Sequence, residues 1–279
     1  MLSRALLVTV ATLALAPRAA LPSISVVGLG YVGAVSVACY SQIGHRVIGV
    51  DLDLGKVEKI AAGCSPIVEE GLAEALTDGV AADLITASAN VLDAVLDTDV
   101  TFVCVGTPSR TDGTVDLAAL RAVAQEIGAA LALKSNYHLV VVRSTVPIGT
   151  TRLQVLPEIE RVSGKRCGVD FGFCFHPEFL REGVAIADFY APPKTVIGQF
   201  DEKSGAMLAK VYRSIEAPLL LTSLEVAEMV KYADNTWHAV KVAFANEIGK
   251  VCQSVDVDSH KVMDISDIRQ TGYFLTQDP

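Results

Sequence analysis

One segment near the end of the chain carries four polar residues at a spacing that could build a site. They are Lys231, Asn235, His238 and Asn246, within the stretch VAEMVKYADNTWHAVKVAFANEIG from Val226 to Gly249. A helix advances about 100° per residue, which places all four side chains within roughly 80° of arc. An ammonium, an imidazole and two amides on one stripe suit the wall of a binding or catalytic site. A solvated helix face is the alternative, although Asn is a poor helix former there.

The helix that must position this stripe is predicted from its boundaries. Thr222-Ser-Leu-Glu225 has the pattern of a capping box, which marks a helix N-terminus. From there to Gly249 the sequence contains no Pro or Gly. We therefore predict one long helix.

A second polar cluster follows an apolar segment that begins at Phe171, in the sequence FGFCFHPEFLREG. His176, Glu178, Arg181 and Glu182 come directly after this predicted strand. Glu178 and Glu182 are four residues apart and would share one side of a helical turn. The position at a strand end favours a site, and surface ion pairs are the alternative.

A glycine-rich turn near the start of the sequence predicts dinucleotide binding. The β-branched run Ile24 to Val27 leads into Gly28-Leu-Gly30-Tyr-Val-Gly33, then an apolar helix pattern to Gly44 and a second strand, Arg46 to Val50. Such a turn lets the backbone approach a pyrophosphate, and Asp51 is placed to accept hydrogen bonds from a ribose. An acid at this position favours NAD over NADP. A purely structural glycine turn is the alternative.

Strands and helices continue to alternate, which predicts an α/β fold with a Rossmann-like, doubly wound parallel sheet. Val100 to Val105 is a buried-type strand that leads into Gly106-Thr107-Pro108, and His138 to Val142 leads into Arg143-Ser144-Thr145. Asp116 to Leu133 between them is an amphipathic helix. Ligands of open α/β sheets lie beyond the carboxyl ends of strands, so Thr107 and Thr145 are candidate cofactor contacts. Ordinary turn chemistry is the alternative for each threonine.

Composition narrows the class of protein. The chain has 279 residues, of which 51% are hydrophobic, so a globular core is expected. Its formal net charge of -9 argues against a surface that binds nucleic acid or an anionic membrane. Six cysteines without zinc-type spacing indicate buried thiols in a reducing compartment, no metal site and a cytoplasmic protein. Residues 1–22 are set apart as a leader or a mis-called start. Their apolar run leaves a secretory signal, an organelle transit peptide and an upstream start codon open, and no membrane span is expected in the mature protein.

From Ser23 to Ile265 the sequence resembles the UDP-glucose/GDP-mannose dehydrogenase family. The resemblance rests on GLGYVGAV, SPIVEEGL, VCVGTPS, VVVRSTVPIGT, HPEFLREG and the long helix segment. It implies an NAD-binding Rossmann-like domain at residues 23–215, followed at 216–279 by the start of an all-α central domain, through which full-length members form homodimers. SPIVEEGL and NTWHAVKV resemble the branch that acts on GDP-mannose. UDP-glucose is the alternative substrate.

The resemblance also implies roles for single residues. Those that match the family's NAD contacts are Tyr31, Val32, Asp51, Lys56, Thr107 and Thr145, together with Gly28, Gly30 and Gly33 of the turn. Those that match its sugar site are Glu182, Lys231, Asn235, His238 and Asn246. Family members oxidise the sugar C6 alcohol twice with two NAD⁺, through a cysteine thiohemiacetal and a thioester. In this chemistry Lys231 would stabilise charge on the C6 oxygen, Asn235 would hold a water or donate to that oxygen, and Glu182 would orient the hydrolytic water.

One departure from the family concerns its nucleophile. The family's Gly-Gly-Ser-Cys segment is expected soon after Val262-Met-Asp-Ile265, where this sequence reads SDIRQTGYFLTQDP. We therefore expect an incomplete chain without full turnover. Two further readings are a dehydrogenase of 3-hydroxy acids, which also combines a glycine turn with a Lys-x-x-x-Asn helix, and a non-catalytic NAD-binding or partner module.

Overall fold

A computed structural model describes residues 21–266 of the chain. Its centre is one eight-stranded sheet with the strand order β3-β2-β1-β4-β5-β6-β7-β8. The strands are β1 (Ile24–Val27), β2 (Val47–Val50), β3 (Ile85–Ser88), β4 (Val100–Val103), β5 (His138–Val142), β6 (Phe171–Phe175), β7 (Thr195–Gln199) and β8 (Leu219–Thr222). The first six have the order of a dinucleotide-binding sheet, whose direction of winding reverses between β1 and β4. The predicted α/β fold is confirmed.

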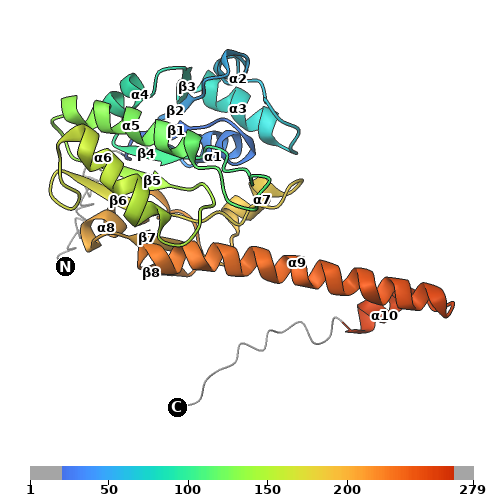
Figure 1. Ribbon diagram of the computed structural model, residues 1–279. Coiled ribbons are helices and arrows are strands. Elements are labelled where there is room, and N and C mark those ends of the chain that lie inside the picture. The colour runs from blue at the N-terminus through green and yellow to red at the C-terminus, as the bar shows by residue number, and fades with distance from the viewer. Residues whose placement is uncertain (1–20, 267–279) are drawn as a thin grey trace, which may run out of the picture.

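Helices cover both faces of the sheet (Figure 1). One apolar core joins the sheet to α1 (Tyr31–Gln42), α2 (Leu54–Ala61), α3 (Leu72–Ala81), α7 (Ala185–Tyr190) and α8 (Glu202–Val211). A second core on the opposite face takes in α4 (Val91–Asp97), α5 (Ala118–Leu133), the π-helical turn η1 (Thr151–Val155), α6 (Leu156–Ser163) and the first turn of α9 (Leu224–Ser254). β1, β2, β4, β5 and β6 are buried along their whole length, as expected for parallel strands covered by helices on both faces.

The sheet departs from the predicted parallel pattern at one edge. β6 and β7 pair antiparallel, and β8 then pairs parallel with β7. The five other pairings are parallel. In consequence the carboxyl ends of β1 to β6 share one edge, while β7 and β8 point the other way. β8, which lies past residue 215, completes the sheet.

α9 is the predicted long helix, but its N-terminus differs from the prediction. Ser223, not Thr222, is the N-cap, and its hydroxyl accepts a hydrogen bond from the Val226 amide. The prediction of a capping box is therefore wrong, and the Glu225 side chain forms an ion pair with Arg152. Gly249 does not end the helix, which continues to Ser254. The ion pair with Arg152 in η1 engages the Glu225 carboxylate, so that carboxylate does not serve as the helix cap.

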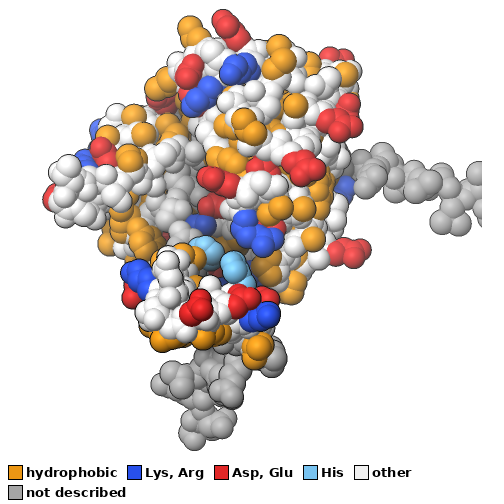
Figure 2. Space-filling view, turned by 90° about the vertical axis from the view of Figure 1, so that its right-hand side faces the viewer, with side chains coloured by type: hydrophobic (Ala, Val, Ile, Leu, Met, Phe, Trp, Pro, Cys, Tyr) orange, Lys and Arg blue, Asp and Glu red, His pale blue; other side chains and the backbone are white. Residues whose placement is uncertain are grey.

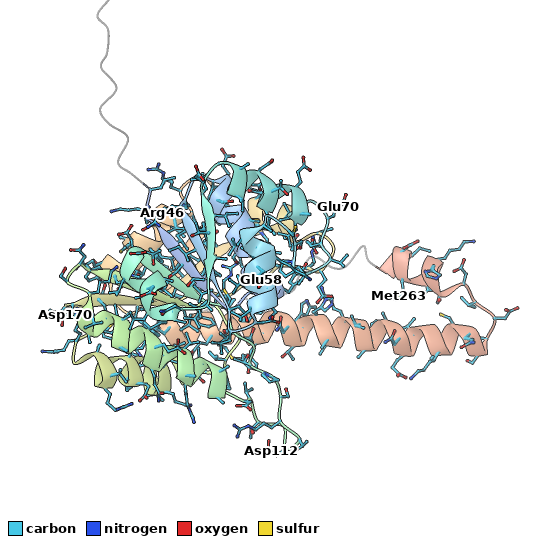
Figure 3. All side chains as sticks on the ribbon, turned by 90° about the horizontal axis from the view of Figure 1, so that it is seen from above. Arg46, Glu58, Glu70, Asp112, Asp170 and Met263 are labelled. Atoms are coloured by element: carbon cyan, nitrogen blue, oxygen red, sulfur yellow. The ribbon has the colours of Figure 1, made fainter. Side chains whose placement is uncertain are left out.

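Beyond its first two turns α9 projects away from the sheet, and α10 (Ser259–Ser266) folds back beside its far end (Figures 1 and 3). Large apolar side chains on this projecting part are exposed, Trp237 and Phe244 among them. Between residues 21 and 266, no helix is long and apolar enough to cross a membrane. The predicted leader, the end of the sequence and the expected nucleophile context lie outside the described residues.

Candidate active site

The glycine-rich turn connects β1 to α1 with a tightly packed backbone. Gly28 has a φ of +99°, which favours glycine, and a Cβ on Gly33 would lie 1.7 Å from the Gly28 carbonyl oxygen. A Cβ on Gly30 would meet nothing within 4 Å. Gly30 is the N-cap of α1 and provides no side-chain cap, so the first amides of the helix face open space. Open space in front of free helix N–H groups fits a pyrophosphate.

Asp51 follows β2 at the same sheet edge, as predicted. Its carboxylate accepts hydrogen bonds from the amides of Leu29 (2.7 Å) and Asp53 (2.9 Å), and Lys56 Nζ lies 3.3 Å away. Burial opposes the negative charge, but these backbone hydrogen bonds and the Lys56 ammonium together lower the pKa of Asp51 below its ordinary value. A carboxylate oxygen can accept more than one hydrogen bond, so ionised Asp51 fits the hydroxyls of a ribose.

Thr107 and Thr145 come together at the ends of β4 and β5. The Thr107 hydroxyl donates to the Thr145 carbonyl oxygen at 2.6 Å. β4 and β5 are neighbouring parallel strands, which brings the two threonines close together, and both are partly buried. Their assignment as cofactor contacts remains a prediction.

Lys231 lies at this same edge, held by the loop that follows β6. Its side chain is only 8% exposed, and Nζ lies 2.8 Å from Glu178 Oε1 and also donates to the Glu178 carbonyl oxygen. The Phe179 ring is 5.5 Å from the ammonium. A buried ammonium requires such a counter-charge, because desolvation of an unpaired charge is costly. The structure thus places a paired, largely desolvated ammonium beyond the strand ends.

Glu178, rather than Glu182, is the carboxylate that contacts Lys231. Residues 178–182 are not helical, so the expected helical turn that would place the two glutamates on one side is absent. Glu182 is exposed and has no side-chain hydrogen bond or ion pair within residues 21–266. Its role stays a prediction. The sequence signal for Glu178 was its place immediately after a buried strand.

The other members of the polar stripe lie on α9 but away from the sheet. Asn235, His238 and Asn246 are exposed, and only Lys231 is buried. Figure 2, which faces the free end of α9, shows a hollow in the surface beside the helix, with acidic, basic and histidine side chains on its rim. The predicted stripe is therefore a helix face that is buried in the domain only at Lys231 and exposed at its three other members.

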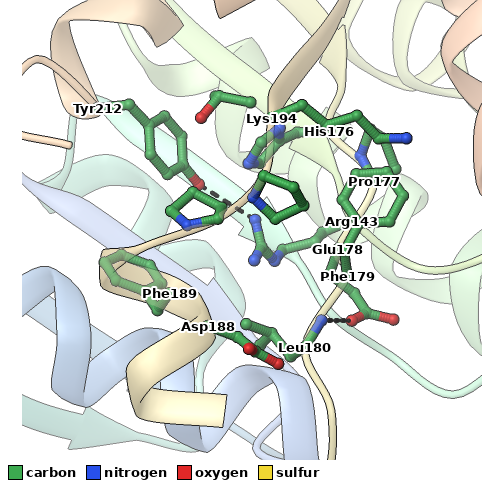
Figure 4. Close-up of a pocket in the computed structure, with 13 residues that line it drawn as sticks. Arg143, His176, Pro177, Glu178, Phe179, Leu180, Asp188, Phe189, Lys194 and Tyr212 are labelled. Atoms are coloured by element: carbon green, nitrogen blue, oxygen red, sulfur yellow. Dashed lines mark hydrogen bonds between the residues drawn. The ribbon is translucent and has the colours of Figure 1, made fainter. Parts of the chain in front are cut away.

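Glu178, the partner of Lys231, lies in the wall of a small cavity (Figure 4). Its volume of about 40 Å³ suits a few waters and not a sugar nucleotide. Arg143 lies in its wall, almost fully buried, and donates to the Tyr212 hydroxyl at 3.1 Å. His176 is also in the wall, and burial beside the Arg143 charge lowers its pKa to about 3. His176 is therefore neutral at pH 7.

The cysteines of the chain are all free. Burial raises the pKa of Cys39, Cys104 and Cys167 to about 12, and that of Cys174 higher still. A thiol with such a pKa is a poor nucleophile at neutral pH. Cys64 is exposed on the loop after α2, and Cys252 lies buried near the end of α9. Across residues 21–266 no group of three or more His, Cys, Asp or Glu side chains is arranged to hold a metal ion.

Two family models match the sequence. Residues 22–216 match the NAD binding domain of the UDP-glucose/GDP-mannose dehydrogenase family, and residues 225–278 match its central domain. The chain belongs to the UDP-glucose/GDP-mannose dehydrogenase family. The resemblance seen in the motifs is confirmed, and with it the NAD-binding character of the Rossmann-like domain.

Relatives within this family include enzymes of both substrate branches. The GDP-mannose 6-dehydrogenase of Pseudomonas aeruginosa is 51% identical over 87% of this chain and 56% of its own length. The UDP-glucose 6-dehydrogenase of Haloferax volcanii is 40% identical over 86% of this chain and 57% of its own. The chain thus spans little more than half the length of these relatives.

Solved structures of the family superpose well on this fold. The crystal structure of a ternary complex of GDP-mannose dehydrogenase from Pseudomonas aeruginosa matches with a TM-score of 0.85, over 87% of this chain and 56% of that one, at 51% identity. A UDP-glucose dehydrogenase from Pyrobaculum islandicum matches with a TM-score of 0.86, over 91% of this chain and 59% of that one, at 41% identity.

Proposed function

We propose that this chain provides the NAD-binding domain and the first wall of the sugar site of an enzyme that oxidises GDP-mannose to GDP-mannuronate. The observation that carries the proposal is the buried Lys231–Glu178 pair, which lies at the same sheet edge as the glycine turn and Asp51. Identity of 51% to a GDP-mannose 6-dehydrogenase, against 40% to a UDP-glucose enzyme, supports GDP-mannose as the substrate.

The proposed cofactor site consists of groups at the carboxyl ends of the strands. The amides of Tyr31 and Val32 at the start of α1 would bind the pyrophosphate, and Asp51, supported by Lys56, would accept hydrogen bonds from the ribose. Thr107 and Thr145 would lie beside the rest of the dinucleotide. Bound NAD supplies the acceptor for the hydride that leaves the sugar carbon.

The proposed sugar chemistry places Lys231 at the C6 oxygen. Loss of the hydroxyl proton leaves negative charge on that oxygen, and a desolvated ammonium stabilises it more strongly than water does. Glu178 keeps Nζ in one place, 2.8 Å from its carboxylate. Asn235, one helical turn further along α9, would donate to the same oxygen or hold a water.

The remaining residues are assigned to the later stage and to the rest of the substrate. Oxidation of an alcohol to an acid requires a water, which we assign to Glu182 as the orienting carboxylate. His238 and Asn246, both exposed on α9, would bind the sugar or the phosphates. None of the buried cysteines with raised pKa is assigned to the covalent step.

We also propose a division into an NAD-binding segment at 23–215 and a second segment at 216–279, which begins with β8 of the sheet and continues with α9 and α10. We propose that this second segment mediates a homodimer. The support for the dimer is the exposed apolar surface of α9, where Trp237 is 60% and Phe244 is 59% exposed. Apolar patches of this kind are typical of protein interfaces.

Cofactor binding is the first test, by isothermal titration of NAD into the purified chain. Asp51→Asn removes a charged acceptor and should weaken binding by roughly tenfold to a hundredfold. The matched control is Asp78→Asn, which changes an exposed acid on α3 and should bind NAD normally. A chain that does not bind NAD, or equal binding by both variants, would contradict the proposed site.

Substrate choice is tested by saturation-transfer NMR with GDP-mannose and UDP-glucose in the presence of NAD. We expect GDP-mannose to bind more tightly, and Lys231→Met to weaken it, whereas Lys241→Met, an exposed lysine on the same helix, should not. Tighter binding of UDP-glucose would contradict GDP-mannose as the substrate and indicate a UDP-glucose dehydrogenase. Binding of NAD but of neither sugar nucleotide would favour a non-catalytic NAD-binding module.

A further inference from the structure

The side chain of Tyr31 does not face the glycine turn but extends to a distant loop. Its hydroxyl donates to Glu69 Oε2 at 2.6 Å. Glu69 lies in the loop between α2 and α3, within SPIVEEGL. The first residue of α1, whose amide belongs to the proposed pyrophosphate site, is thus tied by its phenol to a carboxylate 38 residues further along the chain.

The same carboxylate also holds the loop that carries Glu182. Glu69 accepts hydrogen bonds from the Gly183 amide on Oε2 and from the Ala185 amide on Oε1, each at 2.8 Å. The Tyr31 hydroxyl lies 3.2 Å from the Arg181 carbonyl oxygen. The backbone is therefore held on both sides of Glu182, at Arg181 and at Gly183, while the Glu182 side chain itself stays exposed.

The chemistry of the cluster favours a single fixed arrangement. The hydrogen bond from the Tyr31 hydroxyl, and those from the two amides, outweigh the cost of burial and lower the pKa of Glu69 below its ordinary value. Glu69 is therefore ionised at neutral pH, and charge-assisted hydrogen bonds are roughly twice as strong as neutral ones. Gly183 has a φ of +87°, so the loop makes a turn that few residues other than glycine adopt.

We propose that Glu69 is a positioning residue that couples the glycine turn to the loop of Glu182, so that a dinucleotide bound at the turn also fixes the carboxylate of the sugar site. Both the role of that loop and the binding of a dinucleotide at the turn rest on the proposed function. Glu69 acts through Tyr31 on one side and through the amides of Gly183 and Ala185 on the other.

The coupling is measured by amide hydrogen exchange in the purified chain, resolved at Gly183 and Ala185 by NMR. NAD binding should slow exchange at both amides by roughly tenfold in the unaltered protein, because the turn and the loop become fixed together. Glu69→Gln keeps the shape of the side chain but replaces one acceptor oxygen with a donor. In this variant exchange should be faster without NAD, and addition of NAD should no longer slow it.

The matched control is Glu70→Gln, which changes the neighbouring glutamate, an exposed side chain at the edge of the domain (Figure 3). It should show the same NAD effect as the unaltered protein. Coupling is reciprocal, so Glu69→Gln should also weaken NAD binding by up to the same factor of roughly ten. Tyr31→Phe, which removes only the hydroxyl, should abolish the effect of NAD on the loop in the same way.

The outcomes separate this inference from the proposed function. A purely structural role would raise exchange at Gly183 and Ala185 in Glu69→Gln but leave the slowing by NAD intact, and that result would overturn the coupling. An unaltered protein that binds NAD without any change at these amides would overturn it as well. Failure to bind NAD at all would instead contradict the proposed function. Circular dichroism of each variant verifies that the fold is retained.

Discussion

Substitution of Glu228 should lower the free energy of unfolding, because this residue fixes α9 to the sheet domain. Its side chain is fully buried, and its carboxylate accepts hydrogen bonds from the Gly149 amide, from the Thr151 amide at 2.9 Å and from the Thr151 hydroxyl at 2.7 Å. These donors lie at the start of η1, where amides have no partner within the helix. The carboxylate thus caps one helix from another and holds the loop that follows Thr145.

The magnitude follows from the three donors. Glu228→Ala leaves them buried without an acceptor, at about 1 to 3 kcal/mol for each, and partial access of water reduces the sum, so we expect a loss of about 4 kcal/mol in the free energy of unfolding. Glu228→Gln keeps one acceptor oxygen but directs a donor at another donor, and should cost about 2 kcal/mol. A difference of this size is large compared with the total stability of a typical domain.

Urea unfolding followed by far-ultraviolet circular dichroism measures the change. The control is Glu247→Ala, on the same helix, where the glutamate is exposed and, among residues 21–266, is paired only with Lys250 at i,i+3. The gain in helix propensity from Glu to Ala is common to both variants and cancels between them. We expect the control to change stability by less than about 0.5 kcal/mol. Equal effects at the two positions would refute the idea that Glu228 anchors α9.

Three further predictions concern acid stability, the glycine turn and self-association. Burial lowers the pKa of His138 and His176 to about 3. Below pH 6.5 the unfolded state therefore binds more protons than the folded state, so the free energy of unfolding, which is full above that pH, falls by about 2 kcal/mol per histidine by pH 5. Urea midpoints at pH 7 and pH 5 measure this loss, and His260→Gln, which removes an exposed histidine, is the control. Gly30→Ala should fold normally but bind NAD less well, whereas Gly33→Ala should destabilise the fold, because its Cβ would meet the Gly28 carbonyl. Thermal melts and NAD titration separate the two effects. Normal NAD binding by Gly30→Ala would contradict the proposed pyrophosphate site. Trp237→Ser should shift light-scattering mass toward the monomer, and an unaltered protein that is already monomeric at micromolar concentration would refute the dimer.

Sequence patterns predicted the positions of the site better than its contacts. The strand at His138–Val142 has the predicted bounds, and the order of strand, glycine turn, helix, strand and acid is present from β1 to Asp51. These features are local, because β-branched runs and glycine turns are dictated by backbone sterics. A likeness of motifs therefore predicts which residues lie at the carboxyl edge of the sheet.

The partners of the charged residues could not be predicted in the same way. Glu178, and not Glu182, pairs with Lys231, and Glu225 pairs with Arg152 in place of the predicted cap. Glu69 and Glu228 were not singled out at all, although both collect backbone amides from segments far away in the sequence. Such contacts depend on how elements pack, and no spacing rule within one element contains that information.

The polar stripe on α9 shows where reasoning from one helix stops. Lys231 and Asn246 share a face, but Asn246 lies fifteen residues further along, which is about 22 Å of helix axis. Two residues so far apart cannot both contact one sugar carbon, whereas Lys231 and Asn235 are separated by only about 6 Å along the axis. The arc angle describes the helix seen from its end and omits its length. We therefore propose that Lys231 and Asn235 act at the reacting carbon. Asn246, on the part of α9 that projects away from the sheet (Figure 1), would contact a group well removed from that carbon.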